Sequence, residues 1–425
     1  MTNNKKTKNT STLWIMLAAF LCYTGMYAVR KSFLAGQYHD LNLGYKFNSK
    51  TILIISQVLG YMLSKFIGIK FISEMPKQKR INWLIGLVLS GLLMLGLFAV
   101  LPTKYKAIAL FFNGLPLGMV FGIVISYIEG RVNSEMLAAA LSATFIFSTG
   151  LVKTTGVFLM QDFNTDEYFM PFLTSLLFMP LFFISVWMLK QSKKPSVVDI
   201  AERARRVPMF ARERKEFLKQ NGFGYFGLVT IYILLTIVRD FRDNFIVEFW
   251  SELGYSKVPQ IITLTEIPVA VITLIVVSMG ILIRKNLKAF NTGMWFTIMS
   301  AILMLFSTLL FEKGIISPIS WTISTGIGIY LPYILYHCLL FERLIALLNY
   351  KGNVGFLFYL ADALGYLGSV IVLFLKEIIG FKQSWDNFFV SLNSKIPILI
   401  IFLSALTMIY FNKKIALKKT QKLNV

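Results

Sequence analysis

The chain has 425 residues, of which 56% are hydrophobic, 15% are aromatic and only 15% are charged, and its formal net charge is +22. A soluble protein of this length needs more polar residues to cover its surface, so the composition excludes a soluble domain as the main fold. The positive charge does not indicate nucleic-acid binding, because the lysines and arginines gather in particular loops between long apolar segments, as membrane topology requires.

Twelve apolar runs follow one another along the chain, and most are long enough to cross the roughly 30 Å hydrocarbon layer as helices. They are continuously apolar, whereas the strands of a membrane barrel alternate in polarity. We therefore predict an all-α polytopic membrane protein with about twelve transmembrane helices in two pseudo-symmetric six-helix bundles. The runs are approximately Thr12–Leu34, Thr51–Ser73, Ile81–Leu101, Ala107–Ile128, Met136–Met160, Phe169–Lys190, Phe226–Trp250, Gln260–Ile283, Phe290–Phe311, Ser317–Phe341, Val354–Leu375 and Pro397–Phe411.

One long polar and basic segment, Gln191–Gly224, lies between the sixth and seventh runs. It predicts an N-terminal bundle over 1–190, a basic cytoplasmic linker over 191–224 and a C-terminal bundle over 225–425. Its stretch Ser196–Ala204 fits either an amphipathic helix on an anionic leaflet or part of a solvated linker. With both termini in the cytoplasm, the cytoplasmic loops carry most of the loop lysines and arginines, so we expect a multi-pass inner-membrane protein in this orientation.

Ionisable side chains within the predicted helices are the strongest functional signal, since each costs about 2.5–3.5 kcal/mol near the bilayer centre. When the two halves of the chain are aligned, Arg30 matches Arg239 and Lys153 matches Asp362. Such a repeat is typical of transporters whose halves are related by a pseudo-twofold axis. The charged residues within the runs that we single out are Arg30, Lys65, Lys153, Arg239, Asp240, Glu266 and Asp362.

Cations form the larger share of these residues, which favours an electropositive cavity that binds an anion. Arg30 and Arg239, one from each half, are the candidates for bidentate binding of a carboxylate or phosphate. Lys65 and Lys153 would add positive charge to the cavity. Tyr27, one turn before Arg30, could offer a hydroxyl to the same ligand.

A structural interpretation of the same residues stays open, in which each cation only neutralises a nearby acid. Arg239 would then pair with Asp240 or Asp243, and Lys153 with Asp362 across the pseudo-twofold axis. A third interpretation uses Glu266 and Asp362 as proton carriers, because burial raises the pKa of a carboxyl group.

Other chemistry finds little support in the sequence. Cys22 and Cys338 both fall inside predicted helices, so neither a disulfide nor a metal-ligand spacing is present, and the chain has only two histidines. No nucleophile elbow or phosphate-binding glycine loop occurs. We expect no enzyme activity, no cofactor and no metal.

Two stretches carry a resemblance to a known family. Tyr27–Phe33, which reads YAVRKSF, and Gly60–Ile67, which reads GYMLSKFI, resemble the first two helices of the organophosphate:phosphate antiporters of the major facilitator superfamily, which include glycerol 3-phosphate and hexose phosphate carriers. The family has a Tyr-x-x-Arg-Lys-x-Phe stretch, a following Ser-Lys-Phe and a second substrate arginine in helix 7. Here Arg30, Lys65 and Arg239 occupy these places, so the resemblance implies that they bind a phosphoryl group.

The chain departs from that family in its fifth helix, where Thr144–Gly150 stands in place of a segment with a substrate-responsive histidine. Lys153, about one turn further on, is a candidate for the missing charge if its face of the helix points inward. Glu266 and Asp362 are further departures, and they keep a proton-coupled mechanism open.

We therefore expect a secondary active transporter of a small organic anion, such as a phosphorylated metabolite exchanged for phosphate, working by alternating access. The alternatives are a proton-coupled transporter that uses Glu266 and Asp362, and a transporter-like sensor that binds an anion and signals through Gln191–Gly224. The expected partners are a small anionic solute and the lipid bilayer, without nucleic acid, and we expect a monomer.

Overall fold

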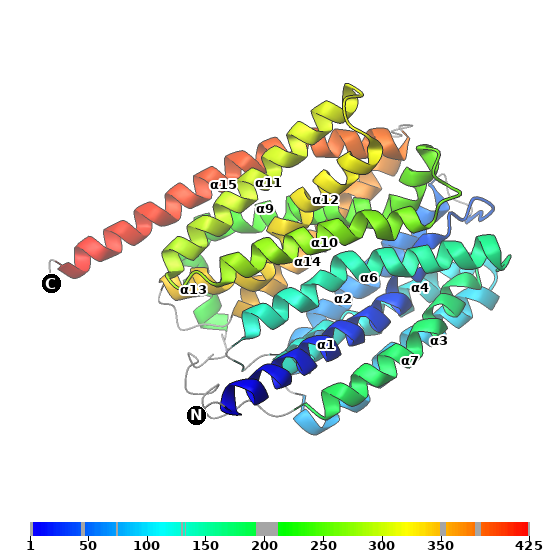
Figure 1. The fold of residues 1–425 in the computed structure, drawn as a ribbon, viewed down its shortest axis with the longest axis horizontal. Helices are drawn as coiled ribbons and strands as arrows, with labels where there is room; N and C mark the ends of the chain where they lie inside the picture. Colours follow the sequence, from blue (N-terminus) through cyan, green and yellow to red (C-terminus); the bar gives the residue numbers. More distant parts are fainter. Residues whose placement is uncertain are drawn as a thin grey trace. The chain divides into compact units, whose positions relative to one another are not determined.

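The computed structural model describes residues 3–43, 47–73, 75–128, 131, 133–192, 211–348, 354–378 and 384–423. Every regular element in these residues is a helix, as the apolar runs predicted. Figure 1 shows the helices in sequence colours, and the predicted amphipathic stretch Ser196–Ala204 lies outside the described residues.

The first half of the chain follows the predicted runs closely, with one break. The fourth run is split into α4 and α5 because Pro116, inside α4, cannot donate a backbone hydrogen bond and disturbs the last turn. The elements are α1 (Asn3–Lys31), η1 (Ser32–Ala35), α2 (Ser49–Ser73), η2 (Lys77–Lys79), α3 (Arg80–Val100), α4 (Thr103–Leu117), α5 (Val120–Ile128), α6 (Ser134–Asp162) and α7 (Met170–Lys190).

The second half contains two helices that are longer than their apolar runs. Helix α9 begins at Ala211, so the end of the predicted linker is helical and continuous with the seventh run, and α15 begins at Trp385 and not at Pro397. Polar residues extend both helices beyond their apolar parts, and hydropathy does not register them. The elements are α9 (Ala211–Glu252), α10 (Gln260–Ile281), α11 (Asn286–Glu312), α12 (Pro318–Leu335), the π-helix η3 (Tyr336–Leu340), α13 (Phe341–Leu348), α14 (Val354–Ile378) and α15 (Trp385–Leu423).

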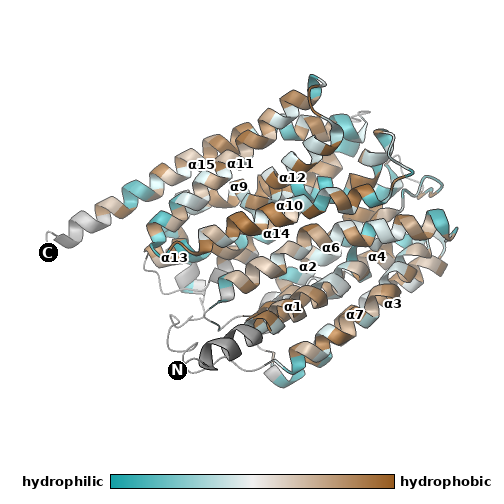
Figure 2. Ribbon diagram, in the orientation of Figure 1, coloured by the Kyte–Doolittle hydropathy of each residue, from teal (hydrophilic) through white to brown (hydrophobic). Residues whose placement is uncertain are grey.

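Eleven helical segments among the described residues are long and apolar enough to cross a membrane, and α14 covers the remaining predicted run. Many large apolar side chains point outward on these helices, including Leu93, Leu177, Met279 and Phe402. Figure 2 shows hydrophobic residues along most of the helices. Such surfaces suit lipid and not water, so the prediction of an all-α, multi-pass membrane protein is confirmed.

The chain packs into two compact units, whose boundaries differ from the predicted halves. The first unit comprises Met1–Arg203, Arg242–Ile267 and Val370–Asp386, and the second comprises Ala204–Phe241, Pro268–Ser369 and Asn387–Val425. The end of α9, the start of α10 and the end of α14 thus belong to the first unit. Polar contacts account for this assignment: the end of α9 pairs with Lys31 and Lys50, α10 bonds to Thr154 of α6 through Thr263, and α14 accepts a bond from Thr51 of α2 at Glu377.

Close helix packing in the first unit depends on small residues. A Cβ atom at Gly60 of α2 would lie 2.1 Å from the carbonyl oxygen of Phe111, and one at Gly114 of α4 would lie 2.2 Å from the carbonyl oxygen of Gln57. Since backbone atoms cannot move aside, glycine is required at both positions. This contact fixes the face of α2 that carries Gln57 and Tyr61, next to the predicted anion-binding residues.

Candidate functional site

The first unit brings Arg30 and Lys65 together around one aromatic ring. The guanidinium carbon of Arg30 lies 3.5 Å from the ring centroid of Tyr61, and the ammonium of Lys65 lies 5.1 Å from it. Both cations are buried, at 2% and 4% exposure. The face of an aromatic ring attracts a cation, so Tyr61 stabilises both buried side chains where they lie.

Aromatic side chains extend this cluster on the side of α1, α5 and α6. The Lys65 ammonium lies 5.2 Å from the Phe121 ring centroid, and the Phe121 ring lies 6.1 Å from that of Phe145. Tyr27 contacts the same group, with its ring 6.1 Å from Phe145 and 5.2 Å from Tyr23. Tyr27 is therefore connected to Lys65 through the Phe145 and Phe121 rings.

The backbone beneath Arg30 is held by two buried amides. The Gln57 side chain donates to the carbonyl oxygen of Arg30 at 2.7 Å and to the side-chain oxygen of Asn113 at 2.7 Å. Asn113 in turn donates to the carbonyl oxygen of Val29 at 3.1 Å. These bonds fix the end of α1, from which the Arg30 side chain extends.

Lys153 belongs to a second cluster of the first unit, centred on Asp243. Its ammonium lies 2.6 Å from one carboxylate oxygen of Asp243, and the ammonium of Lys31 lies 2.6 Å from the other. Lys31 also donates to the side chain of Asn244 at 3.1 Å. One buried acid thus holds cations from α1 and α6, a pairing that alignment of the two halves did not anticipate.

Two further buried ion pairs occur in the same unit. Lys50 of α2 pairs with Glu248 of α9, and Arg242 pairs with Glu266 of α10 at 2.9 Å. Glu266 is also packed against α6, because a Cβ atom at Gly150 would lie 3.1 Å from its Cγ. The predicted coupling acid Glu266 is therefore an ion-pair partner in this structure.

Sequence reasoning did not single out Lys31, Lys50, Arg242 and Glu248, and it named Asp243 only as a possible partner of Arg239. The signal was nevertheless present, since acidic and basic residues alternate in the apolar seventh run, and two lysines stand at the ends of the first loop. Their partners could not be identified because they lie on helices far apart in the sequence.

The second unit holds Arg239 against Asp240 and two tyrosine rings. The guanidinium of Arg239 donates twice to Asp240 Oδ1, at 3.0 and 2.5 Å. Its central carbon lies 4.1 Å from the ring centroid of Tyr333 and 5.4 Å from that of Tyr366. Arg239 thus has the same kind of aromatic support as Arg30, together with the neighbouring acid that the structural interpretation proposed.

Asp362 lies in the second unit within a cluster of hydroxyl groups. The hydroxyl of Tyr232 lies 3.0 Å from Asp362 Oδ1, 3.0 Å from the hydroxyl of Tyr333 and 3.0 Å from Nε2 of His337. Gly365, one turn after Asp362, allows α14 to approach α9, since a Cβ atom there would lie 2.8 Å from Thr236 Oγ1. Asp362 and Tyr232 are buried, whereas His337 is partly exposed.

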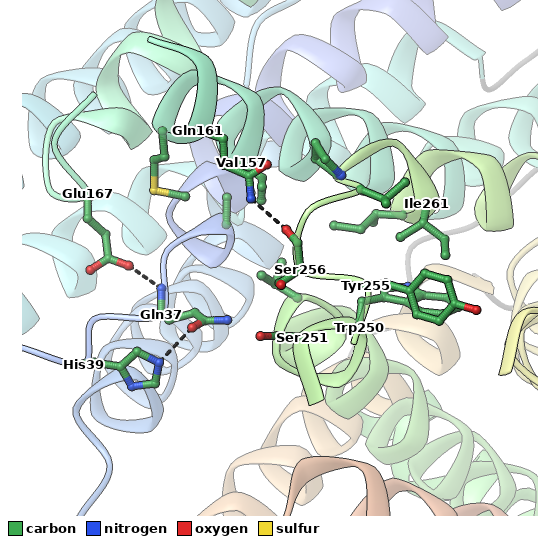
Figure 3. A pocket seen from close by; sticks show the side chains of 16 residues that line it. Gln37, His39, Val157, Gln161, Glu167, Trp250, Ser251, Tyr255, Ser256 and Ile261 are labelled. Carbon is green, nitrogen blue, oxygen red and sulfur yellow. Dashed lines mark hydrogen bonds between the residues drawn. The ribbon is translucent and has the colours of Figure 1, made fainter. Parts of the chain in front are cut away.

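None of the residues of these clusters lines a cavity of about 260 Å³ in the first unit. Figure 3 shows Glu167 bonded to the backbone of Gln37, the Gln37 side chain bonded to His39, and Gln161 bonded to the carbonyl oxygen of Ser256. Because none of the predicted site residues lines it, we do not place the anion site there. Within the described residues no group of three His, Cys, Asp or Glu side chains is arranged to hold a metal ion.

Solved structures with a similar fold are membrane transporters. A D-xylose-proton symporter aligns with a TM-score of 0.56 and 14% identity over 94% of this chain and 96% of its own. A point mutant of the nucleoside transporter NupG aligns with a TM-score of 0.58 and 12% identity over 95% of this chain and 99% of its own. These alignments show that the chain has the fold of major facilitator superfamily transporters.

No curated protein sequence matches the chain significantly. A family model described as a family of unknown function, DUF5690, matches residues 32–414. That range contains Lys65, Lys153, Arg239 and Asp362, and it begins two residues after Arg30. The chain therefore belongs to the DUF5690 family.

Proposed function

We propose that the protein is a secondary active transporter of a small organic anion, with Arg30, Lys65 and Arg239 as the binding residues. The observation that carries the proposal is the pair of buried arginines, one in each unit, each set against tyrosine rings. Burying a guanidinium costs desolvation free energy, so a buried arginine within a membrane helix indicates a functional position. Its planar fork suits bidentate binding of a phosphoryl or carboxylate group.

The proposed substrate is a phosphorylated metabolite, and the proposed coupling is exchange for inorganic phosphate. The resemblance of Tyr27–Phe33 and Gly60–Ile67 to the organophosphate antiporters supports this choice, and so do the paired cations Arg30 and Lys65 at Tyr61. We place the protein in the inner membrane with both termini in the cytoplasm, as the distribution of basic loops indicates.

The sequence predicts that Lys153 adds positive charge to the anion-binding cavity, and the proposal now gives it a different role. Its ammonium shares the Asp243 carboxylate with that of Lys31, so Lys153 is held in an ion-pair cluster and is not one of the proposed binding residues. Opening of the Asp243 cluster would release Lys31 and Lys153 together, and such a two-state set of contacts is what alternating access needs.

A thermal-shift screen of the purified protein tests the anion assignment. Glycerol 3-phosphate, inorganic phosphate, a dicarboxylate and glucose are the probes, and a ligand present at 100 times its Kd stabilises the folded state by about 2.7 kcal/mol. We expect the phosphorylated probes to raise the Tm and glucose to leave it unchanged. The stabilisation should disappear in Arg30→Ala and Arg239→Ala and persist in Arg284→Ala, which removes an exposed arginine.

The sensor alternative is separated from transport by flux. A sensor would bind a phosphorylated probe and lose that binding in Arg239→Ala, yet show no saturable uptake in proteoliposomes. Stabilisation by glucose alone, or equal stabilisation of the wild type and both arginine variants by phosphate, would contradict the anion assignment itself.

A further inference from the structure

A hydrogen-bonded chain in the second unit connects a partly exposed histidine to a buried carboxylate. The Tyr232 hydroxyl lies 3.0 Å from both His337 Nε2 and Asp362 Oδ1. His337 sits in the π-helix η3, Tyr336–Leu340, which interrupts the helical segment between α12 and α13. π-Helices are rare, and they occur frequently at functional sites because the extra residue redirects a side chain.

Tyr232 has one hydroxyl proton but three polar neighbours, so the direction of its hydrogen bonds depends on its partners. When Asp362 is ionised, Tyr232 donates to it and accepts from Nε2–H of His337. When Asp362 is protonated, its O–H can donate to Tyr232, which then donates to an unprotonated Nε2. The hydrogen bonds between His337, Tyr232 and Asp362 can therefore point either towards Asp362 or towards His337. The two arrangements differ by the net transfer of one proton between His337 and Asp362.

The same chain reaches the proposed anion site through Tyr333. The Tyr333 hydroxyl lies 3.0 Å from that of Tyr232, and its ring lies under the guanidinium of Arg239 at 4.1 Å. Tyr366 of α14 flanks Arg239 on another side at 5.4 Å. Asp362 and Arg239 are therefore connected through Tyr232 and Tyr333, so protonation of Asp362 and binding of an anion at Arg239 affect the same side chains.

We propose that His337, Tyr232 and Asp362 form a proton relay that links protonation of Asp362 to anion binding at Arg239. An imidazolium at His337 gives its Nε2 proton to the Tyr232 oxygen while the Tyr232 proton passes to Asp362 Oδ1. His337 is then neutral with its proton on Nδ1, Tyr232 is again a phenol, and Asp362 is a neutral acid. The inference rests on the proposed anion transport and specifies how that transport responds to protons.

Charge explains the sign of the coupling. The titratable and charged groups around Asp362 in the described residues are Tyr232 and Arg239 of α9, paired with Asp240, then Tyr333 and His337 of α12 and η3, and Tyr366 of α14. Because Arg239 is already paired with Asp240, an anion at Arg239 adds negative charge near an ionised Asp362, so Asp362 binds a proton more readily. By reciprocity, protonated Asp362 strengthens anion binding.

The size of the coupling follows from the spacing of the two positions. Tyr232, which is bonded to Asp362, precedes Arg239 by seven residues on α9, a rise of about 10 Å, and we take this rise as the scale of the separation between Asp362 and the anion. Two unit charges at that separation in a protein interior change each other's binding by roughly tenfold. The relay therefore predicts that the anion binds about ten times more weakly once Asp362 is ionised.

Glycerol 3-phosphate counterflow in phosphate-loaded proteoliposomes, measured at pH 6 and pH 8 with equal pH on both sides, tests the relay. The phosphate group itself titrates near pH 6, so the readout is the change in KM between the two pH values in a variant relative to that in the wild type. We expect Tyr232→Phe and His337→Gln to lose about a tenfold component of the pH effect while counterflow continues. Tyr225→Phe, which removes a buried hydroxyl bonded to the Leu357 carbonyl at 2.8 Å on the same helix, should match the wild type.

Infrared difference spectroscopy on the purified protein tests the proton site without any transport. Lowering the pH from 9 to 5 should produce a carboxylic acid band that is absent in Asp362→Asn and shifted in Tyr232→Phe. No such band, or pH profiles of Tyr232→Phe and His337→Gln identical to the wild type, would overturn the relay. Absence of counterflow in the wild type would contradict the proposed transport. The infrared spectra would still show whether Asp362 binds a proton, because they do not depend on transport.

Discussion

Asp243 offers the sharpest test of the ion-pair cluster in the first unit. Asp243→Asn keeps the side-chain volume but removes the charge that faces two ammonium groups at 2.6 Å each. Breaking a buried pair by removing one partner costs about 3–5 kcal/mol, because it leaves an uncompensated buried charge. Since the entropy of unfolding grows with chain length, this corresponds to a fall in Tm of about 3 to 5 °C for a chain of this size.

A double-mutant cycle of Asp243→Asn and Lys153→Met measures the interaction between the two side chains. Lys153→Met in the Asp243→Asn background removes one unpaired cation and should recover part of the Tm, whereas Lys153→Met alone should lower it. The interaction energy measured by thermal unfolding in detergent should be 0.5–3 kcal/mol. Glu312→Gln, at an exposed acid, is the control and should leave the Tm unchanged. Additive effects of the two substitutions would show that Asp243 and Lys153 do not stabilise each other.

Three further predictions concern packing and protonation. Gly114→Leu should sharply lower the yield of folded protein in size-exclusion chromatography, because its Cβ would lie 2.2 Å from a backbone oxygen, whereas Gly86→Leu, with open space around it, should fold normally. Glu266→Gln should lower the Tm more in the wild type than in the Arg242→Met background, and equal shifts would mean that the pair of 2.9 Å is not stabilising. Burial, and then the nearby Glu167 carboxylate, raise the pKa of Tyr38 well above its usual value. The folded protein therefore keeps the phenol proton at a pH where the unfolded chain loses it, so the free energy of unfolding falls as the pH rises above about 10. Tyr38→Phe removes the 2.8 Å bond to the Phe33 carbonyl and should lower the Tm at pH 8 by the equivalent of about 1 kcal/mol, with a smaller further fall on raising the pH than in the wild type.

The number of helices, their order and their membrane character could be predicted because hydropathy is a local property of the sequence. The helix ends at Ala211 and Trp385 could not, since polar residues there continue the helix beyond its apolar part. Pro116 is visible in the sequence, but a proline in a membrane helix produces either a kink or a break, depending on its neighbours. The break after α4 could therefore not be predicted from the proline alone.

The candidate site was predictable in its residue types and less so in its partners. Arg239 lies against Asp240, its neighbour in the sequence. Arg30 and Lys65 meet at Tyr61 from two different helices, and the sequence pointed to them together only through the resemblance of Tyr27–Phe33 and Gly60–Ile67 to a known family. The partners of Lys153 and Glu266 depend on contacts between helices far apart in the sequence, and one sequence without its homologues does not reveal them. The role that we propose for His337 depends on the π-helix η3, which no composition or hydropathy signal indicates.

Uptake of labelled glycerol 3-phosphate into proteoliposomes loaded with inorganic phosphate tests the central claim most directly. We predict saturable uptake that requires internal phosphate, is abolished in Arg239→Ala, and in Arg239→Lys has a KM raised roughly 10- to 100-fold, since lysine keeps the charge but loses the bidentate hydrogen bonds. Uptake that is indifferent to both arginine substitutions, or that is absent from wild-type protein that binds the same probe, would contradict the account.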